Sequence, residues 1–332
     1  MSDLFDLINR LPKVELHLHI EGTLEPAMMM ALAEKHGVQL PYKSVESVQN
    51  AYNFKDLQSF LDLYYLGASV LRDEDDFYRL MSAYLERCRL EGIVHTEMMF
   101  DPQTHTARGV DFSVFMSGFE RARREALERS GVSSLLIMCF LRHLSQDEAI
   151  DTLEAAVPFK DQIYAVGLDS SELGHPPEKF KDVFREAASH GYARVAHAGE
   201  EGPPAYISNA LDVLEVTRID HGVRCLEDPE LVERLVSQQT PLTVCPLSNI
   251  RLRVYENMRS HPILSMLERG LNVSVNSDDP SYFGGYLMDN FAALESSLGM
   301  SEEQARQLIA NSIRSSFVEA EKREAWLRDV KG

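Results

Sequence analysis

Eight apolar segments rich in β-forming residues alternate along this chain with segments of helical periodicity. They span residues 14–19, 93–100, 134–141, 163–168, 193–197, 218–221, 241–245 and 272–278. Strands that alternate with helices in this way form parallel βαβ units. The chain has 332 residues, a length that one closed barrel of such units commonly reaches. The alternation therefore predicts a parallel α/β fold, either a closed barrel or an open doubly wound sheet.

Turn residues mark the helices between these strands. Pro26 opens a helical segment that ends at Gly37, and residues 53–90 carry apolar side chains at helical spacing. Another largely helical region covers residues 289–330. We therefore expect extra helices after the first strand and at the C-terminus. No interdomain linker is visible, so residues 1–332 are predicted to form a single domain.

Polar motifs stand at the C-terminal ends of five predicted strands. They are His17-Leu18-His19, His197-Ala198-Gly199-Glu200, Asp220-His221-Gly222, Cys245-Pro246-Leu247-Ser248-Asn249 and Ser277-Asp278-Asp279-Pro280. An open sheet concentrates function at one switch point, whereas the rim of a closed barrel collects the ends of all its strands. The distribution of the motifs favours a (β/α)8 TIM barrel with a site at its C-terminal rim.

The histidines and one aspartate of these motifs form a candidate metal site. His17 and His19 are two residues apart in one strand, so their side chains point the same way. His197 and Asp278 end two other strands, and a closed barrel brings all four side chains together. Imidazole nitrogen and carboxylate oxygen suit zinc-type ions, and such an ion acidifies a bound water. We predict one Zn²⁺ per chain, although another divalent transition metal would fit the same donors.

Three more residues at the strand ends are candidates for proton transfer and substrate binding. Glu200 follows His197 after a small Ala-Gly pair that allows a sharp turn. A desolvated glutamic acid holds a proton near neutral pH, so Glu200 is the candidate general acid. The alternative is a carboxylate favoured by a helix N-terminus. His221 is placed to hold a proton of the water, and Asp279 to face a substrate, while Cys245 shapes the rim without reacting.

Charge and cysteine content restrict the partners and the compartment. A formal net charge of −19 repels phosphate backbones and argues against nucleic acid as a partner. No segment approaches the roughly 18 apolar residues of a membrane span, and residues 1–10 lack a signal-type apolar core. The four cysteines have no close spacing, which favours a reducing compartment. We expect a cytoplasmic protein without a membrane partner, and the sequence leaves its oligomeric state open.

The motifs, in this order over residues 14–290, resemble those of the adenosine/adenine deaminase family within the amidohydrolase superfamily. The resemblance implies a (β/α)8 barrel with one zinc held by the four predicted ligands. It also implies Glu200 as proton donor to a purine ring, His221 as the residue that orients the attacking water, and Asp279 as a partner of purine N7. These roles coincide with those assigned above from the residues alone.

Two features are similar to the adenine deaminase branch of that family. Glu21 stands where adenosine deaminases typically carry Asp, and its longer carboxylate would occupy space that a ribose needs. The stretches 167–172 and 201–204 also resemble the adenine branch. The resemblance thus implies a purine-salvage enzyme that converts adenine to hypoxanthine and ammonia. Adenines with an alkyl group on N6 would react by the same route.

Three other functions fit parts of the pattern. The nearest is an adenosine deaminase that acts on the nucleoside. A binuclear amidohydrolase would bridge two metals after the fourth strand, where no Lys stands in 164–172 but Glu172 is present. A barrel that only binds a ligand is disfavoured, because a binder needs no proton donor such as Glu200 beside a metal site. Residues 53–72 are either a helical lid over the pocket or part of the core.

Overall fold

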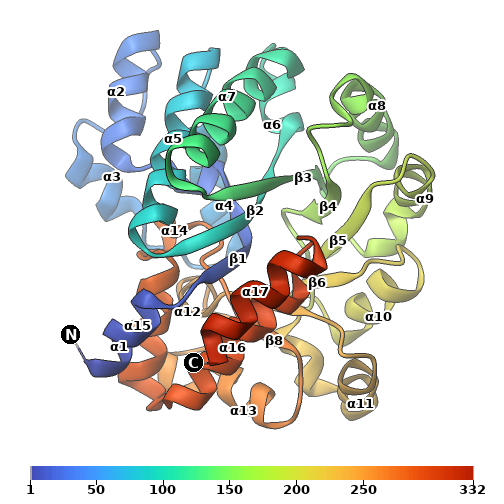
Figure 1. Cartoon of the computed structure of the whole chain (residues 1–332). Helices are drawn as coiled ribbons and strands as arrows, with labels where there is room; N and C mark the ends of the chain where they lie inside the picture. Colours follow the sequence, from blue (N-terminus) through green and yellow to red (C-terminus); the bar gives the residue numbers. More distant parts are fainter. Residues whose placement is uncertain (1, 332) are drawn as a thin grey trace.

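The computed structural model describes residues 2–331, which fold into a barrel surrounded by helices (Figure 1). Within that range, eight parallel strands pair in chain order, each with the next. They are β1 (Lys13–His19), β2 (Ile93–Phe100), β3 (Ser133–Leu141), β4 (Ala165–Asp169), β5 (Ala193–Ala198), β6 (Arg218–His221), β7 (Leu242–Val244) and β8 (Val273–Val275). The predicted (β/α)8 TIM barrel is confirmed, and the open sheet is excluded.

The seam between β8 and β1 is closed by a short backbone contact and one side chain. Leu18 and Asp278 form a parallel bridge, and the amide of His19 donates to the carbonyl of Asp278 at 2.9 Å. The side-chain carbonyl of Asn276 accepts from the amide of Leu16 at 2.9 Å. Closure therefore places the segment after the last strand directly beside the histidines of the first.

The helices lie outside the strands and follow the expected turn and capping residues. They are α1 (Asp3–Arg10), α2 (Pro26–His36), α3 (Val45–Ala51), α4 (Leu57–Ala68), α5 (Glu74–Leu90), α6 (Pro102–Thr106), α7 (Phe112–Ser130), α8 (Gln146–Ala156), α9 (Lys181–Ser189), α10 (Pro204–Asp212), α11 (Pro229–Gln238), α12 (Pro246–Arg251), α13 (Ile263–Glu268), α14 (Pro280–Phe283), α15 (Leu287–Leu298), α16 (Glu302–Ser315) and α17 (Ala320–Lys331). Gly37 ends α2 with φ of 63°, in the left-handed region that glycine adopts without strain. The extra helices expected after the first strand and at the C-terminus are present.

Apolar side chains fill both the barrel and the space between the strands and the helices. A small cluster inside the barrel consists of Met99, Ile137, Cys139, Ala165 and Val195. Outside the strands, α5 and α7 pack against each other through aromatic rings, with the ring centroids of Phe77 and Phe119 5.6 Å apart. These two layers hold the strands rigidly, and the strands in turn position the residues at their C-terminal ends.

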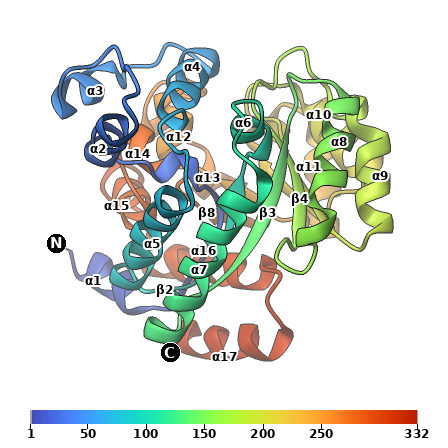
Figure 2. The ribbon, with the colours of Figure 1, turned by 90° about the horizontal axis from the view of Figure 1, so that it is seen from above.

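The two ends of the barrel are covered by different helices. At one end α16 packs on β8 and β1, and α17 packs on α16. Figure 2 shows α3 and α4 at the opposite end of the molecule from α17. The start of β6 lies near the α16 end, where Arg218 pairs with Glu97 of β2 at 2.5 Å inside the barrel. The C-terminal ends of the strands therefore open toward α4.

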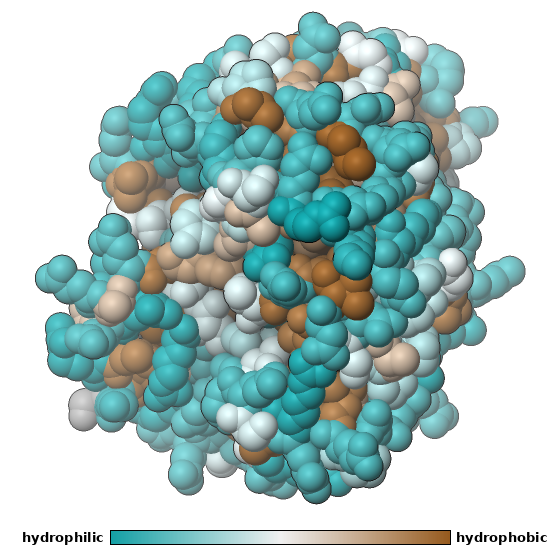
Figure 3. All heavy atoms as spheres, turned by 90° about the vertical axis from the view of Figure 1, so that its right-hand side faces the viewer, coloured by the Kyte–Doolittle hydropathy of each residue, from teal (hydrophilic) through white to brown (hydrophobic). Residues whose placement is uncertain are grey.

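The surface drawn in Figure 3 is mostly hydrophilic, with apolar side chains in small separate groups. Two of the exposed large apolar residues of the protein, Val157 and Leu173, are 49% and 58% accessible. Single exposed apolar residues are normal on a globular protein. Among residues 2–331, no helix combines the length and the apolar composition needed to cross a lipid bilayer.

Candidate metal centre and active site

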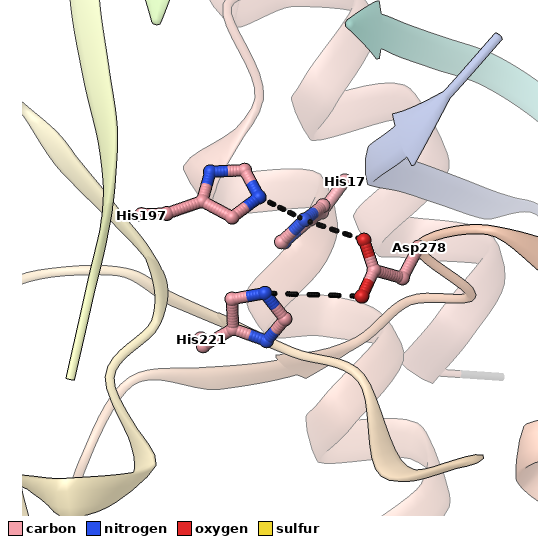
Figure 4. A group of neighbouring side chains, drawn as sticks. All are labelled: His17, His197, His221 and Asp278. Atoms are coloured by element: carbon pink, nitrogen blue, oxygen red, sulfur yellow. Dashed lines mark hydrogen bonds and ion pairs between the residues drawn. The ribbon is translucent and has the colours of Figure 1, made fainter. Parts of the chain in front are cut away.

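The strand ends bring the four predicted metal ligands together in the interior of the barrel rim. His17 Nε2 lies 3.1 Å from His197 Nε2 and 3.2 Å from Asp278 Oδ1. His19 Nε2 lies 3.2 Å from His197 Nε2 and 3.4 Å from Asp278 Oδ1. Figure 4 shows His17, His197 and Asp278 pointing toward one another from β1, β5 and the segment after β8. The three histidines and the aspartate are buried.

The donor atoms of this cluster fit a divalent metal ion. Ligands at about 2.0–2.1 Å from a tetrahedral ion lie roughly 3.3–3.4 Å from one another. The Nδ1 atom of His17 faces the carbonyl of Thr243 at 3.2 Å, and a carbonyl only accepts, so this nitrogen carries the proton. The Nδ1 atom of His19 likewise faces Asp169 Oδ2 at 3.5 Å. Both Nε2 atoms then direct lone pairs at His197, an arrangement that a cation between them stabilises.

Two residues of the site have backbone conformations that are rare for their type. His221 and Asp278 have φ values of 66° and 64°, in the left-handed region. Each such residue costs on the order of 1 kcal/mol or more, and such strain concentrates at functional sites. At Asp278 the turn ends the extended run of β8, so both Asp278 and Asp279 border the same cavity.

Glu200 lies in the turn after β5, buried next to His221. Its Oε2 atom is 3.5 Å from His221 Nε2. Burial, followed by the charges of Asp278 and Glu172, raises the pKa of Glu200 well above its usual range. His221 also lies 3.8 Å from Asp278 Oδ2, and burial lowers its pKa to about 3. Burial thus shifts this pair toward a protonated carboxyl and a neutral imidazole.

Asp279 borders the cavity beside Asp278 and approaches the turn after β1 closely. A Cβ atom on Gly22 would collide with the Asp279 carboxylate and lie 2.7 Å from the Asp279 Cα. Glycine at position 22 is therefore needed for this approach. Burial and the charge of Asp278 raise the pKa of Asp279 well above its usual range. Burial thus shifts the Asp279 carboxyl toward its protonated form, which donates as well as accepts a hydrogen bond.

Glu21 lies behind the wall of the cavity, whereas the sequence suggested that its carboxylate faces the space of the substrate. Its carboxylate accepts from the amide of Asp101 at 3.2 Å and faces His105 Nε2 at 2.8 Å. The Tyr64 hydroxyl lies 3.5 Å from its second oxygen. Among the described residues, those that line the cavity include Tyr64 and Asp101 but not Glu21. The carboxylate therefore supports Tyr64 and Asp101 of the cavity wall from behind.

The cavity has an empty volume of about 380 Å³. This volume counts all the space between the lining atoms, including the part that is open to solvent. The apolar residues Leu57, Phe60 and Leu61 of α4 line it opposite the metal ligands. The Tyr65 hydroxyl of the same helix lies 2.8 Å from Ser170 Oγ. Segment 53–72 thus covers the pocket and at the same time contributes buried apolar side chains.

Sequence reasoning missed two carboxyl groups that border the cavity, Asp101 and Asp169. Asp101 follows β2 directly and accepts from the Tyr64 hydroxyl at 2.9 Å. Together with His19, these residues form a second buried group whose ligand-type atoms lie within 4.8 Å of one another. The sequence did contain a signal for Asp101. In Phe100-Asp101-Pro102 a β-rich segment ends in an acidic residue that is followed by proline, as it does at the end of the eighth strand.

Two further predictions concern residues outside the cavity. The thiol of Cys245 is buried at the start of α12, and burial raises its pKa well above the usual range, as expected for a group that does not react. Glu172, the candidate bridge of a binuclear site, directs both oxygens at backbone amides of residues 199–202. Its lone pairs are therefore engaged by the protein itself.

A sequence model of the family described as "Adenosine deaminase" matches residues 12–332. The chain belongs to the adenosine deaminase family. A curated protein named "Adenine deaminase" from Acinetobacter baylyi is 55% identical, over 98% of this chain and 98% of its own. The predicted family resemblance is thus confirmed.

Solved structures of similar proteins share the fold of this member of the adenosine deaminase family. The crystal structure of adenine deaminase from Arthrobacter aurescens superposes with a TM-score of 0.95 at 51% identity, and covers 97% of this chain and 98% of that one. An amidohydrolase from Burkholderia ambifaria, solved with bound Zn, has a TM-score of 0.90 at 25% identity, with 100% and 93% coverage. The barrel fold is therefore common to these proteins.

Proposed function

We propose that this protein hydrolyses adenine to hypoxanthine and ammonia. One observation carries the proposal: three imidazoles, Asp278 and the buried carboxyl of Glu200 converge in a chain 55% identical to a protein named adenine deaminase. In the overall reaction, water replaces the amino group at C6 and ammonia leaves. An adenine with an alkyl group on N6 would release the corresponding amine by the same route.

We propose that His17, His19, His197 and Asp278 hold one Zn²⁺ per chain. Three nitrogens and a carboxylate oxygen are donors that zinc accepts, and the Burkholderia ambifaria relative was solved with bound Zn. When bound, such an ion lowers the pKa of water toward neutrality and so supplies a nucleophile. Elemental analysis is expected to give about one metal per chain. A ratio of two would favour a binuclear site and contradict this assignment.

The protein's own groups are proposed to move the protons. Glu200, whose raised pKa keeps it protonated, donates to the ring nitrogen beside C6. His221 is neutral and orients the attacking water as an acceptor of its proton. Asp279 borders the cavity beside the metal ligands and binds N7 of the purine.

We propose that the free base is preferred to the nucleoside. The cavity is small, and Tyr64 and Asp101 form part of its wall. Glu21 contributes through these two residues, since its carboxylate contacts the Tyr64 hydroxyl and the Asp101 amide. A ribose on N9 would have to displace this hydrogen-bonded wall. Adenosine, the alternative substrate, is therefore expected to react poorly.

The substrate proposal is tested by measuring ammonia release from adenine, adenosine, N6-methyladenine and guanine with the zinc-loaded protein. We expect kcat/KM to be highest for adenine and lower for adenosine by at least about a hundredfold, since a displaced buried hydrogen-bond network costs several kcal/mol. N6-Methyladenine should release methylamine. Comparable kcat/KM values for adenine and adenosine would support the alternative, an adenosine deaminase that acts on the nucleoside.

The role of Glu200 is tested by Glu200→Gln. The amide has nearly the same shape but cannot give a proton to the ring, so kcat for adenine should fall by roughly 10²–10⁴-fold. Zinc content and melting temperature should stay close to those of the unmodified protein, because Glu200 is not one of the four proposed ligands. A near-normal kcat of the Glu200→Gln protein would show that another group donates the proton to the ring.

We also propose a reducing, cytoplasmic compartment for this protein. Cys88, Cys139, Cys225 and Cys245 are each buried as free thiols in the apolar interior. Buried thiols of this kind behave as small apolar side chains, which matches the environment in which intracellular proteins fold. Detection of the protein in a cytoplasmic fraction would support this location, and its recovery from a secreted fraction would contradict it.

A further inference from the structure

One buried carboxylate outside the cavity makes an unusual set of contacts with the turn that carries Glu200. Glu172 Oε1 accepts from the amide of Gly199 at 2.6 Å. Its Oε2 accepts from the amides of Glu200 at 3.0 Å, Glu201 at 2.8 Å and Gly202 at 2.7 Å. Four consecutive backbone N–H groups thus point at one side chain. Such a concave arrangement of amides is a binding site for an anion, and here the anion is part of the protein.

The surroundings of Glu172 hold it in this position. Its side chain is 1% accessible, so its charge is compensated by the protein rather than by water. A Cβ on Gly202 would lie 2.5 Å from Glu172 Oε1, and therefore only glycine leaves room for the carboxylate. The buried guanidinium of Arg142 donates to the carbonyl of His197 at 2.7 Å. The end of β5 is thus held through the carbonyl of His197, and the turn after it is held through its amides.

We propose that Glu172 is a positioning residue that fixes the 199–202 turn so that the Glu200 carboxyl faces the reacting ring. The inference rests on the proposed function, because it assigns a role toward the proposed proton donor. Glu172 itself does not line the cavity among the residues described, and it touches the turn only through backbone amides. Its effect on the reaction therefore runs through the orientation of Glu200.

The consequence is specific to the step in which the ring is protonated. A proton donor must lie within hydrogen-bonding reach of the accepting atom, and small displacements of a catalytic group reduce turnover strongly. Loss of the carboxylate would leave four backbone amides, three of them buried, with fewer acceptors and would let the turn relax. The turnover number should then fall, while the metal ligands on β1 and after β8 remain in place.

The test uses Glu172→Gln and, from the other side of the same contact, Gly202→Ala. The amide of Gln cannot accept where its NH2 group faces the backbone donors, and the Ala methyl group displaces the carboxylate. Both variants should lower kcat for adenine by roughly tenfold to a hundredfold, with a smaller change in KM and unchanged zinc content. Glu178→Gln is the matched control, because that exposed carboxylate accepts only from the side chain of Asn209 at 2.8 Å.

A double-mutant cycle separates positioning from a general effect on folding. In the Glu200→Gln background no proton donor remains to be positioned, so adding Glu172→Gln should change kcat by less than about twofold. Loss of thermal stability should instead be the same in both backgrounds. Full kcat in Glu172→Gln, or an equal loss of kcat with and without Glu200, would overturn the inference. An unmodified protein that releases no ammonia from adenine would instead contradict the proposed function itself.

Discussion

Gly22 stands where any side chain would collide with Asp279, and this contact illustrates how single residues shape the site. The collision would involve the Asp279 carboxylate and its Cα, so the backbone itself would have to move. His221 and Asp278 adopt left-handed conformations in the same region. The arrangement of polar groups at the rim is therefore set by backbone positions that ordinary strand geometry does not provide.

At this scale we predict that Gly22→Ala impairs substrate handling much more than Gly67→Ala. The methyl group on residue 22 meets backbone, whereas on residue 67 it meets only the ends of side chains, namely the Tyr282 hydroxyl and, at 2.8 Å, the Met29 Cε methyl. We expect kcat/KM for adenine to fall at least about tenfold in Gly22→Ala, because displacements of catalytic groups are costly. Equal kinetics for the two variants would show that Asp279 tolerates the displacement.

At the level of elements, periodicity and turn residues were sufficient to predict the alternation of strands and helices, whereas the polar motifs at the strand ends favoured the closed barrel. Proline at the start and glycine at the end located α2, and the β-rich runs located all of the strands described. The region 53–90 forms two helices, because Asp73 caps α5 and starts it afresh. The short helix α3 escaped prediction because its seven residues carry a weak periodic signal. The local sequence pattern thus shows whether a segment is a strand or a helix. The point at which one helix ends and the next begins depends instead on a single capping residue.

The ion pair between Glu97 of β2 and Arg218 of β6 should be a strong determinant of stability. The two side chains are buried 2.5 Å apart, and Glu97 also accepts from the amide of Phe317. Arg218→Met should lower the free energy of unfolding by about 3–5 kcal/mol, because it leaves a buried charge without its partner. Adding Glu97→Gln removes that charge and should restore part of the loss. Urea denaturation of the three proteins measures both effects, and an unchanged midpoint in Arg218→Met would contradict the prediction.

At the scale of the whole molecule, closure of the barrel brings His17 and Asp278 within 3.2 Å although they are far apart in the sequence. The polar motifs predicted which residues meet at the rim, since every strand end points there. The sequence could not show that Glu21 turns behind the cavity wall or that Glu172 faces the 199–202 turn. Those orientations arise from contacts between loops, and no local pattern encodes them.

Metal binding should therefore stabilise the whole fold. The proposed ligands lie on β1, on β5 and in the segment after β8. An ion bound there would therefore link the first strand of the barrel to the segment that follows the last one. A ligand at a hundred times its Kd stabilises the folded state by roughly 2.7 kcal/mol. Removal of metal by a chelator should lower the melting temperature by several degrees, and added zinc should restore it. In Asp278→Ala the zinc-dependent shift of the melting temperature should be much smaller. A shift as large as that of the unmodified protein would show that Asp278 is not a metal ligand.

The most direct test of the proposed reaction is mass spectrometry of the product formed from adenine in ¹⁸O-labelled water. With the zinc-loaded protein, the account predicts hypoxanthine that carries the label at C6, together with an equimolar amount of ammonia. Glu200→Gln should form the same product far more slowly. Adenine that is recovered unchanged, or hypoxanthine without the label, would contradict hydrolytic deamination at this site.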